Sequence, residues 1–504
     1  MDLSQVLSWK NVAGAFAVYW VTRAFYRLFF HPLANFPGPK LAAITLWYEA
    51  YYDLIQKGQY TFRIAEMHKT YGPIVRISPS ELHVIDPAFH EKLYCQSGRW
   101  NKYKWSYDAF GAEGSTFSAA LHELHQARRV PLNYFFSKAR VAARDDVIVR
   151  NVDKLCARIL ERVGSTINLG AAVSALSQDV ACEFVLDKTY GSLDRDDFNV
   201  AVTDMVQNTN WIWRITKHFP WFSPAMKAIP LGLISKMTNE GTLSFFQFLQ
   251  GIEKQAENRF KLATSSPEKD RTPTLVDEIV DSNLPLPEKA FPRLLPDVQT
   301  IVGAGFETAS SVMRLMLYHV FANPDILQRL RTELATISTA SSVSGVLGFK
   351  ELEQLPYLTS VIMEALRMSP GLGSRLARIA PDRAIFYEDW CIPAGTPVGM
   401  TAILMHNDET LYPNPRSFNP DRWDMPGRRR LNATFAPFSK GTRICLGMHL
   451  AWAELYITLA AIVQRFNFDF QGVQATDFEM ESDEFIIGTR AKTPFEGHVT
   501  LYEN

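Results

Sequence analysis

One stretch constrains this chain more than any other, "FAPFSKGTRICLGMHL", which runs from Phe435 to Leu450. It places Cys445 in a loop of small and polar residues, directly before a run whose apolar residues recur at helical spacing: Met448, Ala451, Trp452, Leu455, Leu459, Ile462 and Val463. That period predicts a buried helix. The partial positive charge and free N–H groups at its start stabilise a thiolate. Gly441 and Gly447 permit tight turns, and Arg443 offers a planar fork for a carboxylate. The pattern therefore indicates a loop that presents sulfur to a metal whose cofactor carries acidic groups, with a buried structural cysteine as the alternative.

The composition is that of a globular protein with a large core. Of the 504 residues, 47% are hydrophobic and 21% charged, which argues against disorder, and the formal net charge is −1, which gives nucleic acid no long-range attraction. We therefore expect no nucleic-acid partner. The five cysteines are scattered singly, so a disulfide framework or a zinc ribbon is disfavoured and a reducing compartment is favoured.

Helical periodicity dominates the chain. The segment 135–163 is one example, whereas the segments 74–85 and 391–403 have the short alternating pattern of strands. We find no internal repeat, and the two loose connectors, 262–274 and 337–348, are too short to mark a domain boundary. The predicted fold class is mainly α with small β-sheets, in a single large domain over residues 41–504.

The N-terminus differs in kind from the rest. Asn11–Thr22 carries no charge and is bounded by Lys10, Arg23 and Arg27, whose long side chains can reach the headgroups of a bilayer. We predict a retained membrane anchor over residues 1–30, with a helix lying on the membrane surface as the alternative. A cleaved signal peptide is disfavoured by Asp2 and by the lack of a small-residue cleavage site.

Three prolines follow this segment. Pro32, Pro37 and Pro39 each fix φ and remove a backbone donor, so residues 31–40 are predicted to form a stiff, extended hinge before a separate folded body.

The cysteine loop carries a specific resemblance. Phe438, Gly441, Arg443, Cys445 and Gly447 match all five fixed positions of the F-x-x-G-x-R-x-C-x-G haem loop, and on this basis the chain resembles the cytochrome P-450 superfamily. The resemblance implies that the cofactor is haem b, held between a long central helix and the helix after the loop. It implies that Cys445 is the axial thiolate ligand of the iron, and that Phe438 and Arg443 belong to the haem site.

A second motif of that family is "EALR". Glu364 and Arg367 are three residues apart on an amphipathic helical run, so their side chains can pair, although such pairs are common by chance and usually lie on the surface. The resemblance places Arg422, in "FNPDRW", as the third member of a structural triad behind the haem.

The segment "AGFET" lies in a predicted helix from after Pro296 to about Asn323. Gly303 and Gly305 each cost a helix about 1 kcal/mol relative to Ala, which indicates a close approach to the backbone. Tight helix packing is one explanation. The resemblance gives another, in which this is the oxygen-activating segment and Glu307 and Thr308 deliver protons.

Further basic residues match positions that bind the haem propionates. In "HQARRV", His125 stands where the family has Trp, and Arg129 matches the family's Arg; a neutral imidazole can still donate one hydrogen bond. Arg375 matches another such arginine, with Arg443 as the third. A solvated basic face is the alternative, and the neighbours Arg128 and Arg378 are open candidates.

The resemblance implies a haem-thiolate monooxygenase that inserts one oxygen atom of O₂ into a hydrophobic small molecule by hydroxylation or epoxidation. NADPH-cytochrome P-450 reductase is the implied electron donor, because no dinucleotide-binding unit or flavin domain is evident. We expect it to dock near Lys440 and Arg428–Arg430. The alternatives are a haem-thiolate isomerase or dehydratase that uses a peroxide, and a non-catalytic haem sensor or carrier.

The segments "FYRLFFHPLANFPGPKLAA", "RISPSELHV" and "FNPDRW" resemble those of fungal microsomal members of the superfamily, in particular enzymes of secondary metabolism of the trichodiene-oxygenase type. This implies an apolar, terpenoid-like substrate and a location at the endoplasmic reticulum membrane, with the catalytic domain facing the cytosol. By family placement, five aromatic residues could wall the substrate pocket: Phe110, Phe117, Trp211, Trp213 and Phe219.

Overall fold

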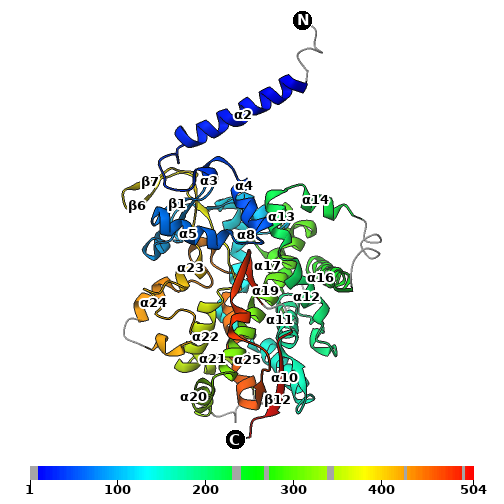
Figure 1. Ribbon diagram of the computed structural model, residues 1–504. Coiled ribbons are helices and arrows are strands. Elements are labelled where there is room, and N and C mark those ends of the chain that lie inside the picture. Colours follow the sequence, from blue (N-terminus) through cyan, green and yellow to red (C-terminus); the bar gives the residue numbers. More distant parts are fainter. Residues whose placement is uncertain are drawn as a thin grey trace.

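The computed structural model describes residues 9–229, 240–265, 272–337, 346–424, 428–490 and 494–503. Helices dominate these residues and the strands are short, which confirms the predicted class (Figure 1). The helices of the first half are α2 (Trp9–Phe29), α3 (Lys40–Ile44), α4 (Trp47–Ala50), α5 (Tyr60–Tyr71), α6 (His90–Leu93), α7 (Lys104–Asp108), α8 (His122–Phe135), α9 (Lys138–Ala143), α10 (Asp145–Leu160), α11 (Leu169–Leu186), α12 (Val200–Thr209), α13 (Ile212–His218) and α14 (Phe222–Lys227). Those of the second half are α16 (Glu240–Ser265), α17 (Leu275–Asp281), α18 (Leu286–Lys289), α19 (Phe291–Phe321), α20 (Pro324–Leu334), α21 (Phe349–Leu352), α22 (Pro356–Met368), α23 (Ala402–His406), α24 (Arg428–Thr434) and α25 (Met448–Arg465).

Four small sheets complete the fold. The largest has the order β1 (Ile74–Arg76), β2 (Leu82–Val84), β8 (Pro397–Gly399), β5 (Arg378–Ile379) and β3 (Asn101–Lys102). The others are β4 (Thr166–Asn168) with β12 (Glu496–Leu501) and β9 (Phe466–Asp469), the hairpin of β10 (Met480–Glu484) and β11 (Ile486–Thr489), and the pair of β6 (Ile385–Tyr387) and β7 (Trp390–Ile392). The segments predicted as strands supply β1, β2, β8 and part of β7.

The main core forms where α10, α11, α19, α22 and α25 pack together. Almost every residue of α11 is buried, and its alanines allow α19 to approach closely. A Cβ on Gly305 of α19 would lie 3.1 Å from the Ala181 Cβ of α11, whereas Gly303 has open space around it. Tight helix packing, the simpler of the two explanations, therefore accounts for Gly305.

Two predicted helices have different bounds in the structure. The central helix, α19, begins at Phe291, five residues before Pro296, which lies inside it at the loss of one backbone hydrogen bond. The segment 135–163 is not one helix. It is divided between α8, α9 and α10, because the Ser137 hydroxyl accepts a bond from the Arg140 N–H and starts a new helix there.

The N-terminal helix α2 projects away from the rest of the molecule (Figure 1), and it buries none of its residues. Its 21 residues span about 31 Å. Among the described residues, one helix is long and apolar enough to cross a membrane. That helix is α11, in which 94% of the residues are buried inside the protein, and not α2. The predicted anchor is thus helical and exposed, but it is less apolar than a typical membrane span.

The proline segment is not the extended hinge that we predicted. Residues 31–36 form turns, and the segment packs on the body: Leu33 is buried, and the Arg76 N–H donates to the Pro37 carbonyl at 2.7 Å. The Arg76 guanidinium also donates to the Leu33 carbonyl. These contacts fix the base of α2 on the domain, because the backbone and the side chain of Arg76 both bind carbonyls of the proline segment.

Candidate active site

The cysteine loop folds back on itself immediately before α25. The Cys445 N–H donates to the Phe438 carbonyl at 2.9 Å, and the Phe438 ring packs against Trp452 of α25. Gly441 has φ = 74°, and a Cβ there would lie 2.6 Å from the carbonyl oxygens of Tyr94 and Cys95. The loop can therefore close only with glycine at position 441.

Two opposing influences act on the Cys445 sulfur. Burial raises the pKa of the thiol, whereas the Arg129 guanidinium and the N–H groups of Gly447 and Met448 lower it. By its accessible surface the residue is nevertheless exposed, so protein does not enclose it on every side. A metal cation at this sulfur would displace the proton, and the two N–H groups would then stabilise the thiolate.

The Glu–Arg–Arg triad forms as predicted. Glu364 accepts two bonds of 2.9 Å from Arg367 and one of 2.9 Å from Arg422, and all three side chains are buried. The Trp423 indole donates to the same carboxylate at 3.1 Å. Because the carbonyls of His406 and Pro415 bind Arg367, the triad joins α22 to the chain that leads to the cysteine loop.

A cluster of cations that act on one another through their charges, three of them buried and one half-buried, lies beside that loop. We call Lys102, Arg129, Arg378 and Arg443 the cation cluster; among the described residues, none of the four forms an ion pair with a carboxylate. Arg443 donates to the carbonyls of Trp100, Ala119 and Ala120, and its Nε is buried without a partner in the described structure. Burial and the Arg378 charge lower the pKa of Arg443 to about 9.

His125 belongs to the same site. Its ring is buried, and burial together with the charges of Arg443 and Lys102 strongly lowers its pKa. The imidazole is therefore neutral and can donate one hydrogen bond, as we expected for a histidine at the family's Trp position. Arg129 is held nearby, since its Nη2 donates to the Ile444 carbonyl at 2.8 Å, one residue before Cys445.

Arg375 does not join the cation cluster. Its guanidinium is buried between two carboxylates, with Nη2 at 2.9 Å from Glu49 Oε2 and Nε at 2.7 Å from Glu81 Oε1. Glu49 and Glu81 therefore already neutralise the charge of Arg375, the arginine that we predicted to bind a haem propionate. Arg378, three residues later, is the arginine that the structure brings to the cluster, while Arg128 is paired with Glu288 at 2.7 Å. The motif spacing alone left this choice open.

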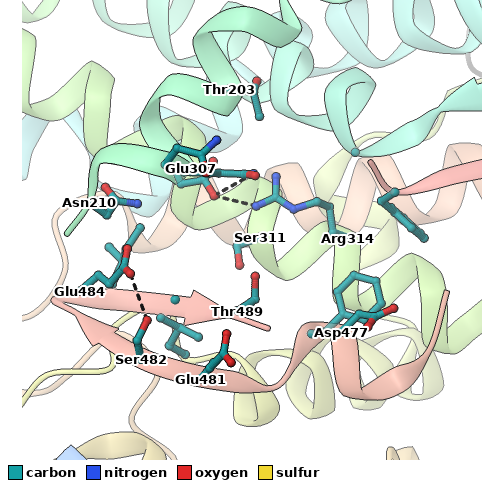
Figure 2. A pocket seen from close by; sticks show the side chains of 18 of the residues that line it. Thr203, Asn210, Glu307, Ser311, Arg314, Asp477, Glu481, Ser482, Glu484 and Thr489 are labelled. Atoms are coloured by element: carbon teal, nitrogen blue, oxygen red, sulfur yellow. Dashed lines mark hydrogen bonds and ion pairs between the residues drawn. The ribbon is translucent and has the colours of Figure 1, made fainter. Parts of the chain in front are cut away.

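Glu307 and Thr308 are adjacent in sequence but face different sides of α19, since neighbouring helical positions project about 100° apart. Glu307 Oε1 lies 2.7 Å from Arg314 Nη2 (Figure 2). The Gln207 side chain, on α12, lies 3.4 Å from the same Glu307 oxygen. Glu307 Oε2 is buried without a partner among the described residues, and burial raises the pKa of this carboxyl. The Thr308 hydroxyl donates to the Ala304 carbonyl at 2.8 Å.

Glu307 lines a polar cleft of about 560 Å³. The cleft separates α12 and α19 from the β10–β11 hairpin, which contributes Ser482, Glu484 and Thr489 (Figure 2). Thr308 and Cys445 are not among its described lining residues. Glu307 thus has access to a space suited to water, on a different side of α19 from Thr308.

Comparison with known proteins decides the family. The sequence model described as cytochrome P450, written cytochrome P-450 here, matches residues 38–493. The chain belongs to the cytochrome P-450 family. It is 37% identical to a cytochrome P-450 monooxygenase of Ascocoryne sarcoides, over 94% of this chain and 95% of that one. It is also 36% identical to a tryptophan 6-hydroxylase of Fusarium equiseti (92% and 91%) and 35% identical to an N-acetyltryptophan 6-hydroxylase of Emericella nidulans (95% and 94%).

As a member of the P-450 family, this protein is a haem-dependent monooxygenase. The described residues fit the cofactor, because a thiol at a helix start lies beside buried cations that lack acidic partners, and haem b carries two carboxylates. The expectation of a haem cofactor is therefore confirmed. The names of these relatives do not support the finer expectations of a trichodiene-oxygenase type or of a terpenoid substrate.

Three of the aromatic residues predicted to wall the substrate pocket of this P-450 lie together. Phe110, Phe117 and Trp213 form one cluster with Tyr107 and Phe485, and the ring centroids of Phe110 and Phe485 are 4.6 Å apart. We call these five residues the aromatic wall. The two remaining candidates lie elsewhere: Trp211 is exposed, and Phe219 packs against Trp47.

Sequence reasoning missed Lys102 and Phe485, for which no motif spacing gave a signal. Lys440, one of the cations expected to face a reductase, forms an ion pair: its Nζ lies 3.2 Å from Glu91 Oε1. The side chains of residues 428–430 lie outside the described part of the structure.

Proposed function

We propose that this P-450 hydroxylates an apolar aromatic small molecule in fungal secondary metabolism. One substrate C–H bond becomes C–OH while O₂, NADPH and a proton give water and NADP⁺. The observation that carries the proposal is the Cys445 loop beside a cluster of mostly buried cations that lack acids, in a chain of this family. Epoxidation of a C=C bond is the same net oxygen insertion.

In this proposal the Cys445 thiolate would bind the haem iron, and Phe438 supports the loop that holds Cys445. Arg129, Arg443 and His125 bind the haem carboxylates, and we assign Arg378 in place of Arg375, because Glu49 and Glu81 already neutralise Arg375. When bound, the haem iron supplies the centre at which dioxygen is reduced. The chain's own residues would hold that group in place.

Thr308 and Glu307 supply protons in this proposal. The Thr308 hydroxyl can donate on its side of α19, and the Glu307 carboxyl takes up protons from the polar cleft. Because Arg314 holds Glu307 away from Thr308, the carboxyl must rotate or pass its proton through water. The pair favours a monooxygenase over a peroxide-using isomerase, which needs no proton supply, and over a haem sensor or carrier.

Electrons come from NADPH-cytochrome P-450 reductase in this proposal, and α2 anchors the protein in the endoplasmic reticulum membrane with the catalytic domain in the cytosol. The exposure of apolar side chains such as Trp9, Phe16 and Phe25 along α2 supports the anchor, because water would otherwise cover them. The bounds that we propose are 1–30 for the anchor, 31–40 for the proline segment and 41–504 for the haem domain.

The substrate proposal rests on the aromatic wall. Its rings offer flat surfaces and edges that suit another aromatic ring, and two relatives are named as hydroxylases of tryptophan and N-acetyltryptophan. An indole or similar ring system is therefore a better first candidate than the terpenoid scaffold that we expected from the sequence.

The test is turnover in a membrane preparation that contains the full-length protein and a reductase. We expect an indole-containing substrate to gain one oxygen atom, labelled from ¹⁸O₂, with consumption of NADPH. Product formed from a peroxide without reductase would instead favour the isomerase or dehydratase. A haem protein that consumes no NADPH with any offered aromatic or terpenoid compound would favour the sensor.

A further inference from the structure

Arg214 is a buried cation on the polar cleft to which the proposed function gives no role. It lies in α13, lines the cleft and has only 9% of its surface exposed. Its side chain donates no hydrogen bond to the described residues, and its Nη1 is buried without a partner among them. Glu484 Oε1 lies 3.8 Å from its Nη2, which is too long for a hydrogen bond. Because a guanidinium has five N–H donors, and a buried charge is costly when its donors stay unused, the site lacks an acceptor.

The position of this guanidinium is fixed by the segments around it. A Cβ on Gly58 would lie 2.4 Å from Arg214 Nη1, so this glycine leaves the room that the guanidinium occupies. Glu484 is held as well, because its Oε1 accepts a bond of 3.0 Å from the Ser482 hydroxyl (Figure 2). The donors of Arg214 are therefore oriented before any ligand binds, which lowers the entropic cost of binding.

Two residues of the aromatic wall are the chain neighbours of Arg214 and Glu484. Trp213 precedes Arg214 on α13. Phe485 follows Glu484 where β10 turns into β11, and its ring centroid lies 5.5 Å from that of Trp213. Neither ring is among the described lining residues of the cleft, whereas both charged residues are. The edge of the aromatic wall therefore borders the cleft along α13 and the β10–β11 hairpin.

We propose that Arg214 binds a carboxylate of the substrate, so that the substrate class is an aromatic ring system with one acidic side chain. The ring lies against the aromatic wall, and the side chain extends past the edge formed by Trp213 and Phe485 into the polar cleft. A planar carboxylate matches the fork of a guanidinium and accepts two parallel bonds from it. This inference rests on the proposed function, since it narrows the aromatic substrate proposed there.

The acids of the cleft limit the charge of such a ligand. Arg314 pairs with Glu307, but four further carboxylates also line the cleft: Asp204, Asp477, Glu481 and Glu484. Each of them repels an anion that enters. A doubly charged group such as a phosphate ester is therefore disfavoured, and a single carboxylate that reaches Arg214 is favoured.

The test measures the binding of two probes to the haem-loaded, full-length protein by equilibrium dialysis. The probes are an indole with a propionate side chain and the same indole with an uncharged propionamide side chain. Wild type should bind the acid more tightly than the amide by about ten- to a hundredfold, the range expected for a hydrogen bond between charged groups. Arg214→Gln should lose this preference through weaker binding of the acid, with the affinity for the amide nearly unchanged.

Lys57→Gln is the matched control. Lys57 also lines the cleft, but it is exposed, so water already solvates its charge. The preference for the acid should survive this change. Loss of the preference in Lys57→Gln, with retention in Arg214→Gln, would contradict the assignment of Arg214.

Glu484→Gln gives a result that a poorly folded variant cannot imitate. It removes the charge that competes for Arg214, while the amide oxygen can still accept from the Ser482 hydroxyl. The variant should therefore bind the acid more tightly than wild type does, with no gain for the amide. Unchanged or weaker binding of the acid would overturn the inference.

The proposed function fails in a different way. Wild-type protein without a haem-thiolate spectrum, or without NADPH-dependent oxygen insertion into any aromatic compound, would refute the proposed function itself. A working hydroxylase that binds the acid and the amide equally well would refute only the role of Arg214.

Discussion

The Cys445 thiol and the Arg443 guanidinium are each placed where their own charge is disfavoured. Burial raises the pKa of the thiol and lowers that of the guanidinium, so each gains from a cofactor that offers a metal cation to the sulfur and carboxylates to the arginine. A site of this kind is stable chiefly in its loaded form. Residues that look unfavourable in isolation are therefore the best guide to the cofactor.

Replacing Cys445 with Ala tests the axial ligand. The reduced, carbon monoxide-treated protein should show the red-shifted Soret band of cysteinate ligation, and Cys445→Ala should lose it because it removes the thiol of the loop that Arg129 binds at Ile444. Cys391→Ala, at an exposed cysteine, is the control and should keep the band. Loss of the band in the control, with retention in Cys445→Ala, would mean that the ligand is misassigned.

Thr308→Val tests the proton supply, because it keeps the branched shape and removes the hydroxyl that now donates to Ala304. We expect haem content and NADPH consumption to stay near wild type, while product per NADPH falls by about tenfold or more and hydrogen peroxide rises, in line with the usual contribution of a general acid. Both quantities are measured in the same reaction. An unchanged ratio would assign Thr308 to helix packing alone.

At the scale of elements, α2 and the turns of residues 31–36 are bound to the domain through the same side chain. The Arg76 side chain binds carbonyls of Arg27 and Leu33, so the helix leaves the body at a fixed point although it buries no residue of its own. The base of α2 is thus held by the domain, while the apolar side chains along the helix stay exposed.

Removal of residues 1–30 should move the protein from the membrane fraction to the soluble fraction while haem incorporation persists, because the haem site draws on none of these residues. Fractionation measures the shift to the soluble fraction, and the carbon monoxide spectrum measures haem incorporation. Full-length protein that is soluble without detergent would contradict the anchor. Membrane binding that survives the truncation would point to a second contact on the domain.

At the scale of the whole molecule, buried acids make stability depend on pH. Glu454 lies in α25, accepts a bond of 2.5 Å from the Ser177 hydroxyl of α11, and burial raises its pKa to about 7. The unfolded chain loses this proton near its ordinary value of about 4.3, whereas the folded protein keeps it up to about 7. The folded state therefore binds more protons within this window, and its stability falls as pH rises through it.

Glu454→Gln removes this titration and keeps a hydrogen-bond partner for Ser177. The melting temperature of the variant, compared with that of wild type, should therefore rise between pH 5 and pH 8. At pH 8 the gain in the free energy of unfolding should be at most a few kcal/mol. Thermal scans at matched rates across this range provide the measurement. A difference that is constant with pH would show that Glu454 is ionised in the folded protein.

The sequence by itself determined the features that depend on local order. A helix period behind a glycine-flanked cysteine is enough to place sulfur at a helix start, and residues three apart on one helix face can pair, as Glu364 and Arg367 do. The resemblance of the cysteine loop to the haem loop of a known family predicted the family, and the family model that matches residues 38–493 confirmed it. The mainly helical class followed from periodicity, because burial of one helix face leaves a repeating signal along the chain.

Only the tertiary structure decided which charges meet. Motif position favoured Arg375 and left Arg378 open, yet Glu49 and Glu81, about 300 residues away in sequence, bind Arg375 and leave Arg378 opposite Lys102. The same holds for Glu307, whose partner Arg314 turns it toward the polar cleft. Whether a charge is available to a cofactor depends on the sum of its neighbours in space, and distant segments supply those neighbours without any periodic trace in the sequence.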